Sequence, residues 1–427
     1  MIYNETRYNS HWNTKKLSDL GAFARGKSKH RPRDDERLYE GGGYPLIQTG
    51  EVKAANLYIT KHEQEYGEFG LAQSKLWDAG TLCITIAANI AETAILSYPM
   101  CFPDSVVGFR AYPEESSELF MHYVFTYIRN SIQNSVSGSI QDNINIDYLS
   151  QLDFKVPDKV YQDKVVGILG TIDQKIDTNN RICEELETMA KTIYDYWFTQ
   201  FDFPDAEGKP YRFSGGAMEW NEQLKRKIPK GWTVGQLSDI ANITMGQSPA
   251  GETYNENGDG RIFYQGCTDF GTRFPVPRVY TTAPTRFAKA GDILMSVRAP
   301  VGTLNVAIED CSIGRGLAAL NSKLGSQLYL WYTLSGFKQL FDVLDGNGTT
   351  FGSITKDALY EMKVVIPSIA LVKAFEEIVQ PVEQKIRAAE QENRELTKLR
   401  DWLLPMLMNG QVTVAEQPIT ISFNRCK

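Results

Sequence analysis

LSDLGAFARGKS at residues 17–28 and LSDIANITMGQS at residues 237–248 share a Leu-Ser-Asp opening, a glycine and a serine in register. Matching segments continue in the same order along the chain. The further pairs are PLIQTGEV (45–52) with IFYQGCTDF (262–270), AGTLCITIAANIA (79–91) with AGDILMSVRAPVG (290–302), SGSIQDNI (137–144) with NGTTFGSI (347–354), and LDFKVP (152–157) with MKVVIP (362–367). Self-similarity of this kind predicts a duplicated architecture. We therefore interpret the chain as two copies of one structural unit.

The first part of each copy has the pattern of a strand-rich domain. Short β-branched and aromatic runs such as TLCITIA and DILMSV are separated by Gly, Asn, Asp and Pro, which is typical of strands joined by turns. Apolar residues at helical spacing also predict helices over residues 118–131 and 326–341. We predict α+β domains at residues 1–158 and 230–368.

A long helix is predicted after the proline that closes each domain. There the apolar period changes from two to about three and a half residues, and the apolar positions form heptad seams at 169–197 and 379–407. Helices at residues 159–200 and 369–410 would each be roughly 60 Å long, at ~1.5 Å per residue. The remaining segments are a Gly-, Pro- and charge-rich connector at 201–229 and a tail at 411–427.

The two seams can cover each other if the helices pair antiparallel. Setting Asn179 opposite Asn393 brings Leu186 onto Ile386 and Ile176 onto Leu396. Facing amides would satisfy each other and disfavour slipped registers. The alternative is that each asparagine faces solvent. The predicted fold is therefore α+β, with two pseudo-twofold-related strand-rich domains separated by two long antiparallel coiled-coil helices.

Composition restricts the class of protein. The 427 residues are 42% hydrophobic and 23% charged, with no apolar run of membrane-spanning length and a polar start, MIYNETRYNSHW. We expect a cytoplasmic protein without a membrane partner. The six cysteines form no CxxC pair and the four histidines all lie within residues 11–122, so neither a disulfide framework nor a zinc site is expected. The net charge of −7 argues against indiscriminate DNA binding, so a DNA surface would be local or shared with a partner.

Two motifs suggest catalysis, but their context does not fit. GAFARGKS (21–28) matches the phosphate-loop pattern, yet the buried strand and the helix that this loop requires are not predicted beside it. Pro157-Asp158 with Asp173-Gln174-Lys175 loosely matches a nuclease pattern, but Asp173 falls within a predicted heptad helix and the repeat has Ser368 in place of Asp158. No NPPY or DPPY methyltransferase segment is present. We expect no catalytic residue, cofactor or metal, and keep a self-sufficient nuclease or NTPase as the remote alternative.

The order of domain, long helix, connector, domain and long helix resembles the specificity (S) subunit of type I restriction-modification systems. The resemblance covers nearly the whole chain. Its most specific parts are FDFP, GKPY, SGGAMEWN and IPKGW in the connector, the repeated LSD opening with its Gly-Ser turn, and the GSIQ and GTTF segments before each helix. The first copy lacks the SGG and IPKGW lead-in of the second, which leaves the completion of its N-terminal edge open.

This resemblance implies a non-catalytic, DNA-binding subunit. Each of two target-recognition domains would read one half of a bipartite double-stranded DNA site. The helices would set the spacing and dock two modification (methyltransferase) subunits, and restriction/translocase subunits would join through the complex. The specificity subunit of a bifunctional type II enzyme is the closer alternative.

Candidate DNA-binding residues lie mainly in turns at equivalent places of the two copies. In the first copy they form a basic loop, whose donors can bind phosphates or guanine edges: Arg25, Gly26, Lys27, Ser28, Lys29, Arg31 and Arg33. The alternative is a solvated loop neutralised by Asp34, Asp35 and Glu36. In the second copy the same turn is Gly246, Gln247 and Ser248, where a glutamine can read adenine.

Other candidates are less specific. Gln48 and Gln265 align after an apolar strand and suit base-edge contact, or equally a local hydrogen bond at a strand end. Single basic residues are weaker candidates, because an isolated cation is usually a surface charge: Lys53, Arg273 and Arg298. Small polar loops could admit a phosphate or simply turn the chain: Ser137, Gly138 and Gln141 in the first copy, and Gly348 and Thr349 in the second. The bases that are read stay open.

Overall fold

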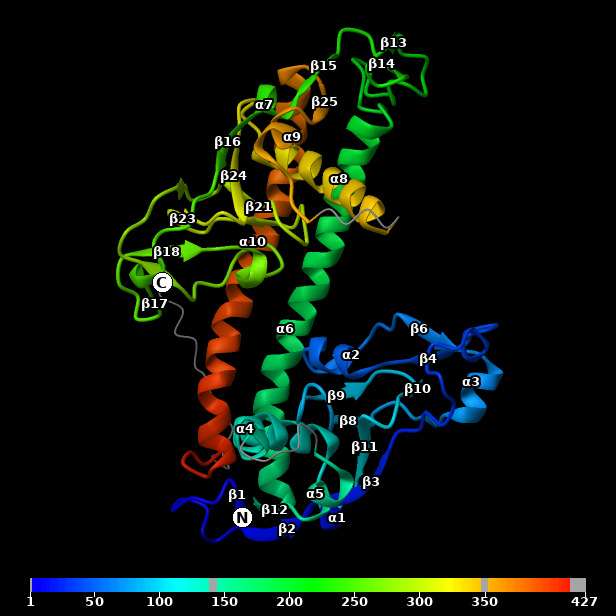
Figure 1. Ribbon diagram of the computed structural model, residues 1–427, viewed down its shortest axis with the longest axis vertical. Coiled ribbons are helices and arrows are strands. Elements are labelled where there is room, and N and C mark those ends of the chain that lie inside the picture. The colour runs from blue at the N-terminus through cyan, green and yellow to red at the C-terminus, as the bar shows by residue number, and fades with distance from the viewer. Residues whose placement is uncertain (1, 138–143, 347–351, 415–427) are drawn as a thin grey trace, which may run out of the picture. The chain divides into compact units, whose positions relative to one another are not determined.

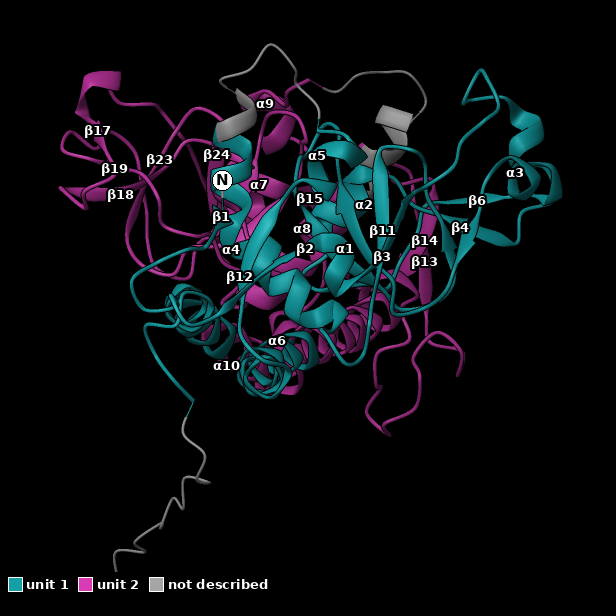
Figure 2. Cartoon of the chain, turned by 90° about the horizontal axis from the view of Figure 1, so that it is seen from below, with its two compact units in different colours: residues 1–179, 392–427 teal, residues 180–391 magenta. Residues whose placement is uncertain are grey.

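The computed structural model describes residues 2–137, 144–346 and 352–414 (Figure 1). Packing divides the chain into two compact units, shown in Figure 2. Unit 1 comprises residues 1–179 and 392–427, and unit 2 comprises residues 180–391. Each unit therefore contains one strand-rich domain together with a part of each long helix.

Unit 1 contains twelve strands among its described residues. They are β1 (Ile2–Tyr3), β2 (Asn13–Lys16), β3 (Gly21–Arg25), β4 (Tyr44–Leu46), β5 (Tyr58–Ile59), β6 (Gln64–Tyr66), β7 (Leu76–Trp77), β8 (Leu82–Thr85), β9 (Thr93–Leu96), β10 (Met100–Cys101), β11 (Val106–Ala111) and β12 (Asp153–Val156). The short helices are α1 (Leu17–Leu20), α2 (Thr49–Ala54), α3 (Glu68–Gln73), α4 (Glu118–Ser137), α5 (Ile146–Ser150) and the 3-10 turn η1 (Glu36–Leu38). The strands form sheets in the orders β3-β11-β8-β9-β5, β6-β4-β10-β7 and β1-β12-β2.

The core of unit 1 lies on both faces of its five-stranded sheet. Side chains alternate along β8, so that Leu82 and Ile84 join the apolar cluster that contains α4. Cys83 faces the other way, into a cluster with Trp77 and Phe102. This two-sided burial explains why the strand is buried throughout and mainly apolar.

Unit 2 repeats this plan. Its strands are β13 (Met218–Asn221), β14 (Arg226–Pro229), β15 (Thr233–Gln236), β16 (Ala241–Met245), β17 (Tyr254–Asn255), β18 (Arg261–Tyr264), β19 (Tyr280–Thr281), β20 (Phe287–Ala288), β21 (Ile293–Ser296), β22 (Leu304–Val306), β23 (Cys311–Ile313), β24 (Leu317–Ser322) and β25 (Lys363–Ile366). The short helices are α7 (Leu237–Ile240), α8 (Gln327–Gly346), α9 (Lys356–Tyr360) and the 3-10 turns η3 (Gly251–Thr253) and η4 (Cys267–Asp269).

The main strands of the two units follow the same order, although the sheets differ in their edge strands. The order β16-β24-β21-β22 repeats β3-β11-β8-β9, and the parallel pair β18 and β23 repeats the parallel pair β4 and β10. Helices α4 and α8, predicted from apolar spacing, occupy equivalent places after the last long strand of each sheet. The predicted duplication of an α+β domain is confirmed.

The long helices are α6 (Lys159–Tyr194), which continues as a π-helical turn, η2 (Asp195–Thr199), and α10 (Ile369–Met408). In unit 1, Asp173 pairs with Arg400 and Asn179 with Asn393. Residue numbers along α10 therefore decrease as those along α6 increase, which means that the helices run antiparallel. In unit 2, the Cys183 thiol lies 3.8 Å from the carbonyl oxygen of Ile386, and the rings of Phe198 and Phe375 are 5.3 Å apart. The predicted antiparallel pairing is thus found in both units.

The asparagine pair lies in unit 1. Asn179 is buried, and its side-chain amide donates to Asn393 at 2.9 Å and to the Glu392 carboxylate at 2.8 Å. The hydrogen bonds from Asn179 and Lys175 hold the pKa of Glu392 below its usual value. Asn179 therefore does not face solvent. Leu186 and Ile386 of the predicted seam pack into the core of unit 2.

Candidate nucleic-acid interface

A cleft of about 480 Å³ opens on the strand-rich domain of unit 2, and we call it the unit 2 cleft. It brings together two residues predicted from the sequence, Gln265 and Arg298, with two that were not predicted, Arg278 and Arg315. The rest of its lining comes from Tyr254, Phe263, Gly266, Cys267, Thr268, Asp269, Val279, Ser296, Ala299 and Gly316.

Main-chain hydrogen bonds tie the loops of this cleft together. The amide of Gly246 donates to Leu317, and that of Gln247 to Ile313, at 2.9 and 3.0 Å. The amide of Gly316 donates to the carbonyl of Gln265 at 3.2 Å, and its own carbonyl accepts from Val297 at 2.9 Å. Because these bonds use only backbone atoms, the exposed side chains can change without loss of the frame.

Three glycines make the packing of these loops possible. A Cβ atom on Gly246 would lie 2.1 Å from the carbonyl oxygen of Gly314. A Cβ atom on Gly314 or Gly316 would lie 2.8 or 2.7 Å from backbone atoms of Gln265. The turn at 314–316 can therefore carry only one side chain, that of Arg315, which lines the same cleft as Gln265.

The exposed polar groups of the cleft differ in their pairing. Arg278 is held by Asp269 at 2.9 Å, and the hydrogen bond and the charge of that carboxylate raise the pKa of Arg278. Arg298, Arg315 and the side chain of Gln265 are exposed, and none forms a side-chain hydrogen bond or ion pair within the part of the chain that the structure describes. Considering the described residues alone, the cleft therefore offers two guanidinium groups and one side-chain amide without partners to an incoming ligand.

Unit 1 has the same backbone frame at its basic loop. The amide of Gly26 donates to Val106 at 2.8 Å and that of Lys27 to Phe102 at 3.2 Å, and a Cβ atom on Gly26 would lie 2.3 Å from the carbonyl oxygen of Pro103. These contacts repeat those of Gly246 and Gln247. The Gly-Ser turns that are aligned in the sequence therefore have the same backbone hydrogen bonds in both units.

The basic loop is organised by Asp104. Its carboxylate pairs with Arg33 at 2.6 Å and lies 3.8 Å from Arg31, and its carbonyl oxygen accepts from Arg25 at 3.0 Å. Lys27 and Lys29 are exposed, without a side-chain partner among the described residues.

One neighbouring acid, Asp35, has partners of its own. Asp35 pairs with Arg37 and His30, and the hydrogen bonds from Arg37 and His30 hold its pKa well below the usual range. Asp35 therefore neutralises Arg37 and His30, and Lys27 and Lys29 have no carboxylate partner among the described residues.

Several predicted residues have local partners or lie outside the described ranges. The backbone N–H of Gln48 donates to the Glu51 carboxylate at the start of α2, and the Lys53 ammonium donates to the side-chain oxygen of Asn89 at 3.2 Å. Ser137 is the last residue of α4. Gly138, Gln141, Gly348 and Thr349 lie outside the described residues.

Arg273 requires a correction. Its side chain is only 3% exposed, forms an ion pair with Glu383, lies 3.1 Å from Glu187, and stacks over the ring of Trp331 at 3.9 Å. Burial lowers the pKa of Arg273, but the carboxylates of Glu383 and Glu187 outweigh that effect and raise it. Because the charge is already satisfied in the interior, we remove Arg273 from the DNA-binding candidates.

The residues of the two catalytic-looking motifs have other tasks. Gly21–Arg25 is a strand, so the first half of GAFARGKS is no loop. Asp173 accepts from Tyr123 at 2.6 Å and from Arg400 at 3.0 Å, and Asp158 accepts from the amide of Tyr161 at 2.8 Å. Within the described ranges no group of three His, Cys, Asp or Glu side chains is placed to hold a metal ion. No described helix is long and apolar enough to cross a membrane.

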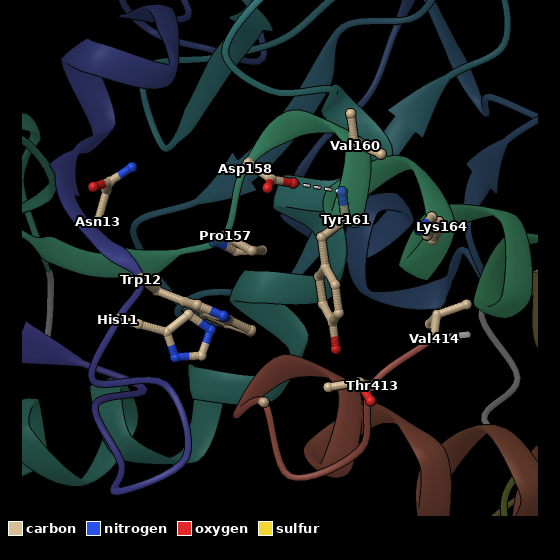
Figure 3. Close-up of a pocket in the computed structure, with 11 residues that line it drawn as sticks. His11, Trp12, Asn13, Pro157, Asp158, Val160, Tyr161, Lys164, Thr413 and Val414 are labelled. Atoms are coloured by element: carbon tan, nitrogen blue, oxygen red, sulfur yellow. Dashed lines mark hydrogen bonds between the residues drawn. The ribbon is translucent and has the colours of Figure 1, made fainter. Parts of the chain in front are cut away.

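A second cavity, of about 390 Å³, lies in unit 1 where α6 begins and α10 ends (Figure 3). The rings of Trp12 and Tyr161 lie 5.5 Å apart on its wall, and Thr413 and Val414 also line it, near the Tyr161 ring. The Tyr161 hydroxyl donates to the carbonyl of Val412 at 2.7 Å. The lining combines aromatic, aliphatic and charged side chains and presents no set of catalytic groups.

The duplicated α+β domain, with the same glycine turn in each copy and two long helices, defines a class of two-domain proteins. The family model for the type I restriction modification DNA specificity domain matches this chain twice, over residues 9–188 and 229–398. The chain therefore belongs to the specificity family of type I restriction-modification systems, as the resemblance implied.

Relatives of known type support this assignment. The type I restriction enzyme MjaIX specificity subunit of Methanocaldococcus jannaschii is 26% identical over 428 residues, covering 95% of this chain and 94% of the relative. The HindI specificity subunit of Haemophilus influenzae is 22% identical over 329 residues, 63% of this chain and 71% of the relative. The crystal structure of the type I restriction-modification S subunit from M. genitalium has the same fold, with a TM-score of 0.55 at 17% identity over 95% of this chain and 99% of that one.

Proposed function

We propose that this chain selects the DNA sequence for a type I restriction-modification complex, each strand-rich domain reading one half of a bipartite double-stranded site. The observation that carries the proposal is the repeated backbone frame with different exposed side chains. Lys27 and Gln247 occupy the same turn in the two copies, and each is free to contact a ligand. A common frame with different donors suits two domains that bind the same polymer but read different bases.

The long helices connect the two reading domains. Because both domains are built on α6 and α10, binding of one half-site turns binding of the other into an intramolecular event. The length of the helices would then determine how many unread base pairs separate the halves. We propose that the exposed faces of these helices also dock two modification subunits.

The chemistry is assigned to partners. Asp173 of the nuclease-like motif is engaged in structural contacts and Gly21–Arg25 of the phosphate-loop motif is a strand, and we propose that modification subunits supply methyl transfer while restriction subunits supply ATP-dependent translocation and cleavage. The net charge of −7 suggests that positive partner surfaces hold the DNA backbone. The isolated chain should then bind DNA weakly at moderate salt.

A domain exchange tests the proposal. Residues 12–157 are replaced by the corresponding domain of another member of the family, and the methylated motif is determined by sequencing the DNA of cells that carry the complete system. One half of the motif should change and the other half should stay. A change in both halves, or in neither, would contradict the assignment of one domain to one half-site.

A biochemical control addresses the alternative of a self-sufficient enzyme. The purified chain is incubated with DNA, Mg²⁺ and ATP, and nicking and ATP turnover are measured. Either activity, if abolished by Lys27→Ala or Asp173→Ala, would overturn the assignment of the chemistry to partner subunits.

A further inference from the structure

The unit 2 cleft presents two arginines in a way that suits recognition of guanine. We propose that Arg315 and Arg298 are specificity-determining residues that bind guanine in the half-site read by unit 2. This inference rests on the proposed function and adds the base and the residues that read it. A guanidinium group can donate two parallel hydrogen bonds to O6 and N7 of guanine in the major groove.

The first argument is the rigidity of the turn that carries Arg315. Gly314 and Gly316 pack against the backbone of Gln265 with no room for side chains, and the amide of Gly314 donates to the carbonyl of Tyr264 at 2.8 Å. The amide of Arg315 itself donates to the Ser248 hydroxyl at 3.2 Å. The start of the side chain is therefore fixed, which lowers the entropy lost when the guanidinium binds.

The second argument is the absence of competing partners. Arg278 lines the same cleft but is held by Asp269, whereas Arg315 and Arg298 have no side-chain partner among the described residues. The amide of Val297, next to Arg298, donates to Gly316, so the two arginine-bearing loops are joined directly. Both guanidinium groups are open to solvent and can form new hydrogen bonds without breaking old ones.

The third argument comes from the strand register of the two units. Strand β11 pairs Val106 with Thr85 on β8, and β24 pairs Leu317 with Ser296 on β21. Two residues before Val106 and Leu317 stand Asp104 and Arg315, so these two residues are equivalent. Two residues after Thr85 and Ser296 stand Ala87 and Arg298, which are equivalent in the same way. The frame is kept while two cations are replaced by an acid and a methyl group. Such a change is expected where the two domains bind different bases.

The alternative role for these arginines is contact with the phosphate backbone. A phosphate contact adds affinity for every sequence and no preference among bases. The experiment must therefore separate a change of preference from a uniform loss of affinity.

The complete methyltransferase complex is assembled with wild-type chain, with Arg315→Gln and with Arg298→Gln. Each complex selects from a DNA library randomised in the unit 2 half-site, and the methylated products are sequenced. Arg278→Gln is the matched control, because it removes an exposed arginine of the same cleft that is already paired with Asp269. Thermal unfolding of each chain checks that these exposed substitutions leave the fold intact.

We expect guanine at a fixed position of the wild-type half-site. Arg315→Gln should weaken that preference by about tenfold to a hundredfold and shift it toward adenine, which glutamine can bind with two hydrogen bonds. Arg298→Gln should relax a neighbouring position, and Arg278→Gln should change neither. The unit 1 half-site should stay the same in all variants.

Three outcomes would overturn the proposal. They are a wild-type half-site without guanine, a uniform loss of binding with unchanged base preference, and no change at all. Failure of the proposed function would look different, because the wild-type complex would then show no sequence preference in either half.

An independent measurement uses a thiol in the same cleft. Cys267 lines the unit 2 cleft and is partly exposed, whereas Cys83, Cys101, Cys183 and Cys311 are buried. In a Cys426→Ser background, DNA containing the selected half-site should slow the reaction of Cys267 with a maleimide. DNA with the guanine replaced should protect less at the same concentration. Equal protection by both DNAs would contradict recognition of the base within this cleft.

Discussion

The two units bury a carboxylate at the same place on their long helices but neutralise it differently. Asp173 on α6 and Glu383 on α10 are 210 residues apart, the spacing of the repeat, and their side chains are 3% and 7% exposed. In unit 1 the cation is Arg400, which comes from the opposite helix. In unit 2 it is Arg273, which comes from the strand-rich domain.

Neither of the two arginines has an arginine at the equivalent position of the other copy. The position equivalent to Arg400 is Ala190, and extending the alignment of Gln48 with Gln265 places Asn56 opposite Arg273. Each buried acid is thus paired with one arginine, which a different element supplies in each copy. In unit 1 a polar cavity of about 170 Å³, lined by Asn56, Asp173 and Arg400 among others, lies beside this acid.

This difference shows that the duplicated frame preserves charge balance and not residue identity. In unit 2 the ion pairs fasten the strand-rich domain to both helices, through Glu383 on α10 and Glu187 on α6. In unit 1 the charged pair joins helix to helix, and the domain contributes the hydroxyl of Tyr123. The two domains should therefore depend on their ion pairs to different degrees.

The largest effect is expected from Arg273→Ala. It leaves Glu383 buried without its cation, and such a loss costs about 3–5 kcal/mol. Arg400→Ala should cost less, because Arg400 is 21% exposed and Asp173 keeps the hydrogen bond from Tyr123. Hydrogen exchange read by mass spectrometry, on peptides of α8 for unit 2 and of α4 for unit 1, measures the two losses separately.

A double variant sharpens this comparison. Arg273→Met with Glu383→Leu removes both charges, and it should recover most of the stability lost in Arg273→Ala. If Arg273→Ala and Arg400→Ala destabilised their units equally, the proposed difference in dependence on the ion pairs would be wrong.

The second effect is a pH dependence confined to unit 1. His122 on α4 is 6% exposed and lies 3.0 Å from the Thr93 hydroxyl; burial, together with the charges of Arg129 and Arg400, lowers its pKa to about 3. The unfolded chain binds this proton near pH 6.5, so stability is fully present above pH 6.5 and falls as the pH drops toward 3. At pH 5 the loss should be about 2 kcal/mol, at ~1.4 kcal/mol per pH unit.

Unit 2 provides the internal control for this prediction. Helices α4 and α8 begin at Glu118 and Gln327, and the same count places Trp331 at the position of His122. Unfolding of unit 2 should lack this component between pH 6.5 and 5, and His122→Gln should remove it from unit 1. A pH dependence that persists in His122→Gln would assign the effect to other groups.

The architecture was predictable because its signals are local and repeated. The heptad steps along 169–197 and 379–407 each require an apolar partner of the same length, and the chain offers only the other copy. The register followed from the two polar seam positions, and Asn179 does donate to Asn393. Short-range periodicity combined with one internal repeat was therefore sufficient for the fold class.

The candidate site was predictable only in part, because loop contacts carry no period. The Gly-Ser turns were predictable from their alignment. Arg315 was not, because it lies outside the aligned segments, before a strand that the alignment does not reach. Extending it pairs Arg315 with Asp104 and reveals the change of charge. Arg273 was misplaced for a different reason: its partners, Glu383 and Glu187, are more than 80 residues away in sequence, and only tertiary packing brings them together.

The smallest expected effect concerns the cavity of Figure 3. In unit 2 the ring of Trp232 stacks on Phe203 at 5.3 Å, and Phe203 stacks on Tyr211 at 4.6 Å. Trp12 is the counterpart of Trp232, and Thr413 is the counterpart of Phe203 by the 210-residue spacing. The cavity of about 390 Å³ beside Trp12 and Tyr161 therefore lies where unit 2 places aromatic rings.

Exchanging these residues tests that correspondence. Phe203→Thr should cost unit 2 about 2 kcal/mol through lost apolar burial and ring stacking. Thr413→Phe should stabilise unit 1 by about 1 kcal/mol, because cavity filling commonly gains 0.5–2 kcal/mol. Thr413→Val is the matched control, since it adds no ring and should change little. If Thr413→Phe destabilised unit 1, the wall formed by Trp12 and Tyr161 would not be shaped for an aromatic neighbour, and the correspondence of Thr413 with Phe203 would fail.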